Sequence, residues 1–284
     1  MAFDGIMKGK RGLIMGVAND RSISWGIAKA CADAGAELAF TYQGEALERR
    51  VKPLAESVGS KLLMPCDVTD DASVDEAFKT IEKEWRELDF VVHGIAFSDK
   101  NELDGLYLNT TRSNFLKTMD ISVYSFTSVA QRAVPLMKDG GSLVTLTYYG
   151  AEQVMPHYNV MGVAKAALEA SVRYLAADVG KDNIRVNAIS AGPIKTLAAS
   201  GIGDFRFILK WNELNAPLKR NVTIEDVGKS GLYLLSDLGS GVTGEVHHVD
   251  SGYHTVGMVS VDNVGETAEL LASMAPKKNS EEAA

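Results

Sequence analysis

Short apolar runs alternate with amphipathic segments along the chain up to about residue 190. Several runs are almost continuously apolar, as in strands covered on both faces, and most end in glycine, serine or aspartate. They predict strands at residues 11–18, 36–43, 61–68, 88–98, 141–150, 184–192 and 245–252.

The segments between the runs have the spacing of amphipathic helices, at residues 22–35, 44–59, 71–88, 114–138 and 159–180. Pro156 suits the first turn of the last of these helices. The alternation predicts an α/β fold: a doubly wound, Rossmann-like parallel sheet of about seven strands with helices on both faces.

No repeat or break in composition divides the chain, so we expect one domain over residues 1–272. The small and polar residues 273–284 predict a disordered tail. Residues 195–220 interrupt the alternation after the sixth strand. A long excursion at the carboxyl edge of such a sheet is typical of a substrate lid, although a packed excursion or an oligomer contact remains open.

Composition excludes several classes of protein. The chain has 46% hydrophobic and 23% charged residues, and its net charge of −8 argues against a nucleic-acid binder. Cys31 and Cys66 lack the spacing of a disulfide framework or a metal site. The first residues lack the apolar region of a signal peptide, and no uncharged run could cross a bilayer. We therefore expect a cytoplasmic protein.

The first predicted strand runs into the loop GVANDRSISWG and then a helix. A dinucleotide site needs a tight turn here, with free backbone N–H groups at the helix N-terminus to hold a pyrophosphate. Gly16 permits the turn, Ser22 and Ile23 begin the helix, and Gly26 allows close helix–strand packing. The familiar G-x-G-x-x-G spacing is absent, so position in the fold carries this prediction.

Further candidates follow the next strands. Gln43 ends the second strand, where an NAD enzyme often carries an acidic residue for the ribose, and residues 43–45 include no cation that would favour NADP. Asp67 and Val68 end the third strand and are expected to flank the adenine. Ile95 and Ser98 follow the fourth strand, near the point where strand order reverses. Together they favour a bound nucleotide.

Tyr158 and Lys165 lie seven positions apart on the long predicted helix. Seven helical residues make about two turns, so the two side chains share one face. Taken alone, the pair could be a core-rim aromatic and a solvated lysine. Tyr148, however, ends the fifth strand beside them, which brings all three residues to the nicotinamide end of a bound cofactor.

This arrangement resembles the short-chain dehydrogenase/reductase superfamily. The usual Tyr-x3-Lys spacing would put the lysine at Gly162, whereas this chain has Tyr-x6-Lys and the upstream tyrosine. That pattern resembles the bacterial enoyl-acyl-carrier-protein reductases of fatty-acid synthesis. GVANDRSISWGIA, AELAFTYQ, CDVTDDAS, YNVMGVAKA, RVNAISAGPIKTLAASGI and GEVHHVDSG fit the family in order, over about residues 5–258.

The resemblance implies NADH-dependent reduction of trans-2-enoyl-acyl-carrier-protein to the saturated form, the last reductive step of each elongation cycle. Tyr158 would hydrogen-bond the enolate oxygen, Lys165 would hold the nicotinamide ribose, and Tyr148 would shape the pocket or serve proton chemistry. Ser98, where the family commonly has alanine, would contact substrate. The stretch of Ile194, Lys195, Thr196, Leu197 and Ala198 would meet the nicotinamide side through its backbone.

The resemblance also implies two partners. The first is other copies of the same chain, in a homotetramer with its contacts at the fourth and fifth predicted helices. The second is acyl carrier protein, whose acidic surface needs a local excess of cations on an enzyme that is itself acidic. Residues 195–220 supply one, with Lys195, Arg206, Lys210, Lys219 and Arg220 against Asp204 and Glu213.

Two rival functions remain. A carbonyl (3-ketoacyl) reductase of the superfamily would need Ser or Thr thirteen residues before the tyrosine, where Thr145 stands, but also the missing lysine at Gly162. A non-catalytic NAD-binding sensor would need no acyl channel and no retained Tyr158 and Lys165.

Overall fold

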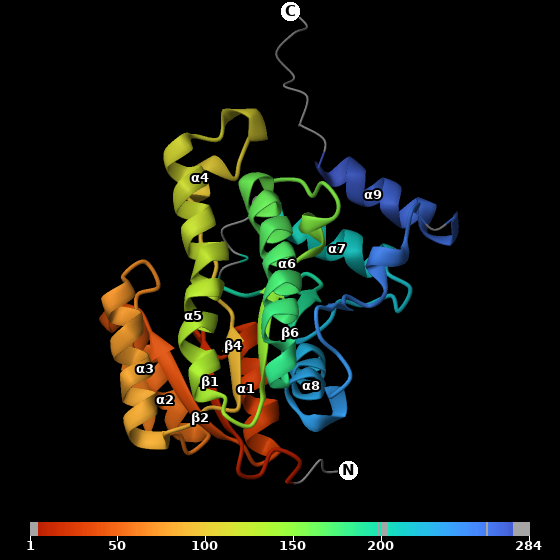
Figure 1. Ribbon diagram of the computed structural model, residues 1–284. Coiled ribbons are helices and arrows are strands. Elements are labelled where there is room, and N and C mark those ends of the chain that lie inside the picture. Colours follow the sequence, from red (N-terminus) through yellow and green to blue (C-terminus); the bar gives the residue numbers. More distant parts are fainter. Residues whose placement is uncertain (1–4, 198, 200–203, 260, 275–284) are drawn as a thin grey trace, which may run out of the picture.

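The centre of the molecule is a parallel seven-stranded sheet. The computed structural model describes residues 5–197, 199, 204–259 and 261–274. The strand order is β3-β2-β1-β4-β5-β6-β7. Figure 1 labels β1, β2, β4 and β6 of this sheet. The strands are β1 (Arg11–Met15), β2 (Glu37–Tyr42), β3 (Leu62–Pro65), β4 (Phe90–His93), β5 (Gly141–Thr147), β6 (Ile184–Ala191) and β7 (Val246–Val249). All seven predicted strands are confirmed, each shorter than its apolar run.

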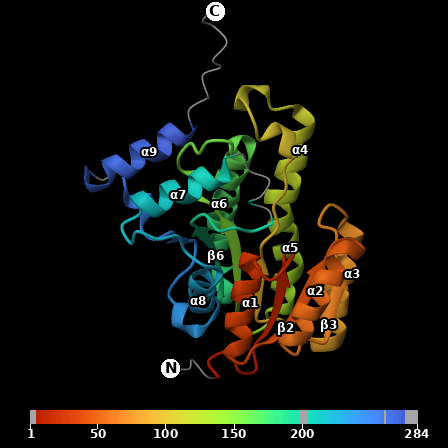
Figure 2. The ribbon, with the colours of Figure 1, turned by 180° about the vertical axis from the view of Figure 1, so that it is seen from behind.

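Helices cover both faces of the sheet, as the sequence predicts. They are α1 (Ile23–Asp33), α2 (Gly44–Ser57), α3 (Asp71–Trp85), α4 (Arg112–Met119), α5 (Ser125–Ala133), α6 (Asn159–Val179), α7 (Phe205–Asn215), α8 (Ile224–Leu235) and α9 (Val264–Met274). Helices α3, α5 and α6 lie on one face, and α1, α2 and α8 on the other (Figures 1 and 2). Their side chains form the two apolar cores on these faces. No helix in the described ranges is both long and apolar enough to cross a membrane.

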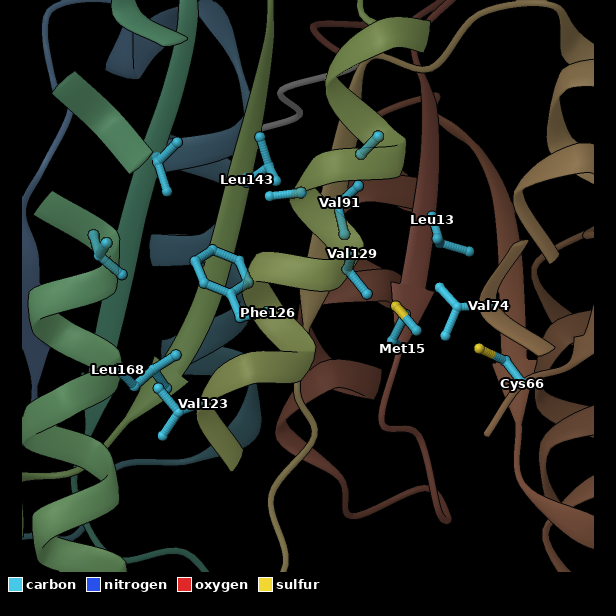
Figure 3. Close-up of a cluster of buried hydrophobic side chains, with 14 of the residues drawn as sticks. Leu13, Met15, Cys66, Val74, Val91, Val123, Phe126, Val129, Leu143 and Leu168 are labelled. Atoms are coloured by element: carbon cyan, nitrogen blue, oxygen red, sulfur yellow. The ribbon is translucent and has the colours of Figure 1, made fainter. Parts of the chain in front are cut away.

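The core on the first face joins the central strands to two helices (Figure 3). Val91 of β4 and Leu143 of β5 meet Phe126 of α5 and Leu168 of α6, and all four side chains are fully buried. Burying such a side chain stabilises the fold by about 1.5–3 kcal/mol. This packing fixes α6, which carries Lys165 and begins directly after Tyr158, against the sheet.

Strand order reverses between β1 and β4, and ligands of doubly wound folds bind in the crevice at that point. Gly16 leaves β1 there with a φ of +85°, and a Cβ atom at this position would lie 2.1 Å from the carbonyl oxygen of Gly94. Only glycine combines this backbone conformation with such a close approach. The turn predicted at Gly16 is therefore confirmed.

The helix predicted at residues 114–138 is interrupted. A π-helical turn at Asp120–Tyr124 separates α4 from α5. Serine hydroxyls hold this region to β4 and to the loop after it, because Ser122 Oγ of the turn accepts from Phe97 N at 3.0 Å and Oγ of Ser125, the first residue of α5, lies 2.9 Å from Nε2 of His93. Such turns arise where side chains compete with the helical ladder.

Two other boundaries differ from prediction. Pro156 lies outside the first turn of α6, which begins at Asn159, because the backbone turns at His157, whose φ of 57° is not helical. At the other end of the chain, α9 extends to Met274, two residues into the predicted tail, since it packs against α7. Residues 275–284 of that tail lie outside the described part of the chain.

Candidate active site

A cavity of about 420 Å³ opens at the carboxyl ends of β1, β4, β5 and β6. It brings together most of the predicted site residues from segments far apart in the sequence. These are Gly16, Ser22, Ile23, Ser98, Tyr148, Tyr158, Lys165, Ile194, Thr196 and Leu197. The cavity therefore spans both the expected phosphate end and the expected chemical end of one site.

Tyr158 lies at the N-terminal boundary of α6 and is 8% exposed. Its two neighbours adopt left-handed backbone conformations, and both are held by other segments. The ring of His157 lies 3.2 Å from Asp204, while Asn159 Nδ2 donates to the carbonyl oxygen of Leu103 at 2.8 Å. These contacts hold the turn that sets Tyr158 on the cavity wall.

The rings of Tyr148 and Tyr158 meet edge to face, with centroids 5.0 Å apart. Such a pair is favourable and restricts both rings. Burial raises the pKa of both hydroxyls above the ordinary value. Both tyrosines are therefore neutral at physiological pH and can donate a hydrogen bond.

Lys165 is 6% exposed, and its ammonium donates to the carbonyl oxygen of Leu146 at 2.7 Å. Burial lowers its pKa to about 8, although the negative charge of Glu169 acts in the opposite direction. The lysine is not the solvated charge that the helix alone allowed. It is a buried cation that faces the same cavity as Tyr158.

The phosphate end fits an anionic group. Ser22 Oγ accepts from the backbone N–H groups of Ala18 and Asn19 at 2.9 and 3.1 Å, which closes the loop rather than capping α1. Within the described part of the chain, the first N–H groups of α1 thus lack a side-chain cap, and the buried Ser24 hydroxyl has no hydrogen-bond partner. Open donors at a helix N-terminus suit a pyrophosphate.

Gln43 and Asp67 meet at the next strand ends, where Gln43 Nε2 donates to the Asp67 carboxylate at 2.9 Å. Burial tends to raise the pKa of Asp67, but hydrogen bonds from Thr69 and Gln43 outweigh this and lower it. The nearest cation of the following helix, Arg49, pairs with Glu45 at 3.4 Å. This corner is therefore negatively charged.

Five predicted residues in the described part of the chain do not line the catalytic cavity, namely Gln43, Asp67, Val68, Ile95 and Lys195. The side chains of Val68 and Ile95 pack against the core. Lys195 lines a separate basic cavity. Ala198 lies outside the described residues. The side chains of Val68, Ile95 and Lys195 therefore would not contact a ligand bound in this cavity.

Ser98 lies on the cavity wall, with its hydroxyl tied to α4. Ser98 Oγ accepts from Thr118 Oγ1 at 3.0 Å and from Asn114 Nδ2 at 3.2 Å. The hydroxyl is thus already hydrogen-bonded within the protein, so Ser98 contributes more to cavity shape than to a free polar contact.

Sequence reasoning missed the apolar wall beside the two tyrosines. Met155, Met161, Phe205 and Ile208 line the cavity next to them. Met161 had a usable signal, because it lies three residues after Tyr158 on the same helix face. Phe205 and Ile208 come from α7, within the excursion at residues 195–220 that the sequence predicts as a lid, but only the tertiary fold shows which of its side chains reach the cavity.

Comparisons with known proteins agree with this geometry. The sequence model described as enoyl-(acyl carrier protein) reductase matches residues 16–254. Enoyl-[acyl-carrier-protein] reductase [NADH] 1 of Rhizobium meliloti is 73% identical over 91% of this chain and 95% of its own.

Two solved structures are also similar. The enoyl-(acyl-carrier-protein) reductase of Anaplasma phagocytophilum in complex with NAD is 64% identical, has a TM-score of 0.89 and covers 92% of this chain and 100% of its own. The Bacillus cereus enzyme with NADP⁺ and an indole naphthyridinone is 52% identical, has a TM-score of 0.88 and covers 91% and 100%. The chain belongs to the enoyl-(acyl carrier protein) reductase family.

Proposed function

We infer that this chain reduces trans-2-enoyl thioesters on acyl carrier protein to saturated thioesters with NADH, the last reductive step of bacterial fatty-acid elongation. One observation carries the inference: a neutral Tyr158 hydroxyl and a buried Lys165 face the same cavity beside an apolar wall. Family membership supports it, because the Rhizobium meliloti relative is named as an NADH-dependent enzyme of this kind.

When bound, NADH supplies a hydride for Cβ of the enoyl group. Negative charge then develops on the thioester oxygen, and the Tyr158 hydroxyl is positioned to donate a hydrogen bond to it. Lys165 holds the ribose hydroxyls of the cofactor and lowers the energy of nearby negative charge. Tyr148 holds the ring of Tyr158 edge-on. Phe205 and Ile208 of α7 form one wall of the cavity, which supports the role of this helix as a substrate lid.

The preference for NADH rests on the negative corner at Gln43 and Asp67. A 2′-phosphate would meet the Asp67 carboxylate there, and Arg49 is already paired. The relative from Bacillus cereus was solved with NADP⁺, so the fold itself accommodates the extra phosphate. Local charge must therefore decide between the two cofactors.

The geometry disfavours a carbonyl reductase. Thr145 is fully buried, with its hydroxyl bonded to the His93 carbonyl at 3.1 Å, and it does not line the cavity. A Cβ atom at Gly162 would lie 2.7 Å from the carbonyl oxygen of Gly150, so no lysine fits at the position that the superfamily uses. The Ser-Tyr-Lys relay of that class therefore cannot form.

An NADH oxidation assay with enoyl thioesters of several lengths, run beside 3-ketoacyl thioesters, tests the proposed function. We expect turnover of the enoyl series only. Preferential turnover of ketoacyl thioesters would favour the rival reductase. Tight NADH binding without turnover of any thioester would favour a sensor.

The carrier partner is supported by a basic cavity of about 570 Å³ between α7 and the start of α8. Arg21, Lys195, Arg206 and Lys210 line it, against Glu213 and Glu225. The cavity shares Pro193 and Ile194 with the catalytic one, which puts it beside the entry for a thioester. A cytoplasmic location goes with this proposal, because the enzyme and its carrier must share one compartment.

Two of the five cations predicted for this patch serve other roles. Arg220 pairs with Asp226 at 2.6 Å, and Lys219 donates to the Leu214 carbonyl. Lys210 forms an exposed pair with Glu213 at 3.4 Å, an interaction of little energy. The docking patch we propose therefore consists of Lys195, Arg206 and Lys210, together with Arg21, which the fold brings to the same cavity.

Replacing Arg206 and Lys210 with glutamate should raise KM for carrier-bound substrate and flatten its salt dependence, while a pantetheine-linked substrate is less affected. The matched control replaces the exposed Lys138 and Lys181 with glutamate. These precede β5 and β6, at the opposite end of the strands from the site. Equal losses on both substrates would mean that the pair supports α7 and does not dock the carrier.

The homotetramer is supported by exposed apolar side chains on the helices predicted to form the contact. Leu116 of α4, Tyr174 of α6 and Tyr124 of the π-helical turn are 60%, 77% and 48% exposed. These segments lie beside one another (Figure 1). Light scattering on wild type and a Tyr174→Glu variant tests the proposal, and a monomeric wild type would refute it.

A further inference from the structure

A buried carboxylate that the proposed reaction does not use lies one turn beyond Lys165. Glu169 of α6 is 7% exposed and accepts a hydrogen bond from Thr147 Oγ1 at 2.7 Å. Thr147 is the last residue of β5, directly before Tyr148. Burying a carboxylate is costly unless other groups compensate for it, so its position next to the site calls for a physical reason.

Helix geometry places Glu169 on the same face as Lys165. Residues four apart on a helix have Cβ atoms about 5–6 Å apart. The two groups form no direct ion pair, since the Lys165 ammonium donates to the Leu146 carbonyl and the Glu169 carboxylate accepts from Thr147. Both side chains are nevertheless buried, so solvent screens their attraction only weakly.

We propose that Glu169 is a positioning residue whose ionised carboxylate keeps the buried Lys165 ammonium charged and so sets the upper pH limit of cofactor binding. This rests on the proposed function only in assigning Lys165 to the cofactor ribose. The direction agrees with electrostatics, because the Glu169 charge raises the pKa of Lys165 against the effect of burial.

Other charges act on this carboxylate. The pKa of Glu169 is raised overall, because burial outweighs the lowering by the Thr147 hydroxyl, His248 and Arg173, and Glu152 adds to the rise. Glu152 is itself bound to His248 Nε2 at 2.7 Å. The titratable and charged groups that face the pair are Arg173 of α6, Tyr158 just before α6, Glu152 after β5, His248 of β7 and the buried His93 of β4, whose pKa burial and the Lys165 charge lower.

The test is the pH dependence of the dissociation constant for NADH, measured by fluorescence on the full chain without substrate. In the wild type we expect affinity to fall as pH rises past about 8, where Lys165 loses its proton. In Glu169→Gln the fall should begin about one pH unit lower. Glu169→Asp keeps the charge and should keep the wild-type profile, which separates charge from side-chain packing.

Asp178→Asn is the matched control, because it removes the same charge from an exposed position further along α6. Its profile should equal that of the wild type. If Glu169→Gln does not fold, the double variant Thr147→Val/Glu169→Met removes the charge without leaving an unpaired hydroxyl, and the same shift is expected.

An unchanged profile in folded Glu169→Gln or in the folded double variant, or an equal shift in Asp178→Asn, would overturn the proposal. Turnover of enoyl thioesters by the wild type is a separate measurement. A failure of the proposed function would therefore leave the NADH binding profile interpretable.

Discussion

Replacing the buried lysine with methionine should stabilise the protein while it weakens cofactor binding. The perturbation is Lys165→Met, which exchanges a buried ammonium for an unbranched apolar side chain of similar length. Lys165 is 6% exposed, so folding removes its charged side chain almost completely from water. When burial of a functional group destabilises the fold in this way, removing the group is expected to raise stability and lower activity.

The magnitude follows from the pKa of Lys165, which falls from 10.5 to about 8 on burial. Each pKa unit corresponds to about 1.4 kcal/mol, so the buried charge costs about 3 kcal/mol of folding free energy at neutral pH. The variant also loses the hydrogen bond to the Leu146 carbonyl, worth about 1 kcal/mol. We expect a net stabilisation of about 2 kcal/mol, or a rise in Tm of about 4 °C.

The gain should depend on pH in a defined direction. Because the folded state binds the Lys165 proton less tightly, the unfolded chain carries more protons between pH 8 and pH 10.5. The free energy of unfolding of the wild type therefore rises with pH across that window. The full destabilisation by the buried charge is present only below it. The advantage of Lys165→Met should shrink as pH rises through the same window.

Urea unfolding of both proteins, at one protomer concentration and at neutral and alkaline pH, measures the effect. The double variant Lys165→Met/Glu169→Gln is the control for the carboxylate that the single variant leaves without its counter-charge. Reduced stability at neutral pH in both variants, or a stability difference independent of pH, would refute the reasoning.

Three further outcomes are expected. Tyr158→Phe should lower kcat by about 10²–10³-fold while the dissociation constant for NADH changes little, because the lost hydrogen bond forms mainly in the transition state; a large loss of NADH affinity would count against this role. The kcat/KM for NADH should exceed that for NADPH, since a 2′-phosphate would meet the Asp67 carboxylate, and equal values for the two cofactors would refute the assignment. Burial raises the pKa of Cys31 to about 12 and that of Cys66 to about 11, so neither should react with iodoacetamide at neutral pH until the chain is unfolded; fast labelling of the folded protein would contradict this.

Sequence alone determined the sheet and the chemistry at its edge. The nearly continuous apolar runs predicted all seven strands, because a strand covered on both faces is apolar along most of its length, and the sequence shows this directly. Parallel strands then bring their carboxyl ends to one edge. For that reason Gly16, Tyr158 and Lys165 could be assigned to a single site before any contact was known.

Tertiary structure decided how those residues meet. The π-helical turn between α4 and α5 depends on serine hydroxyls that bond to other segments, and no local pattern reports such contacts. The left-handed turn at His157 depends on Asp204. No side chain fits at Gly162 because the carbonyl oxygen of Gly150 lies too close. Sequence periodicity records which face of an element is buried. It does not record what that face is buried against, and that neighbour sets the backbone turns, the charge states and the walls of the cavity.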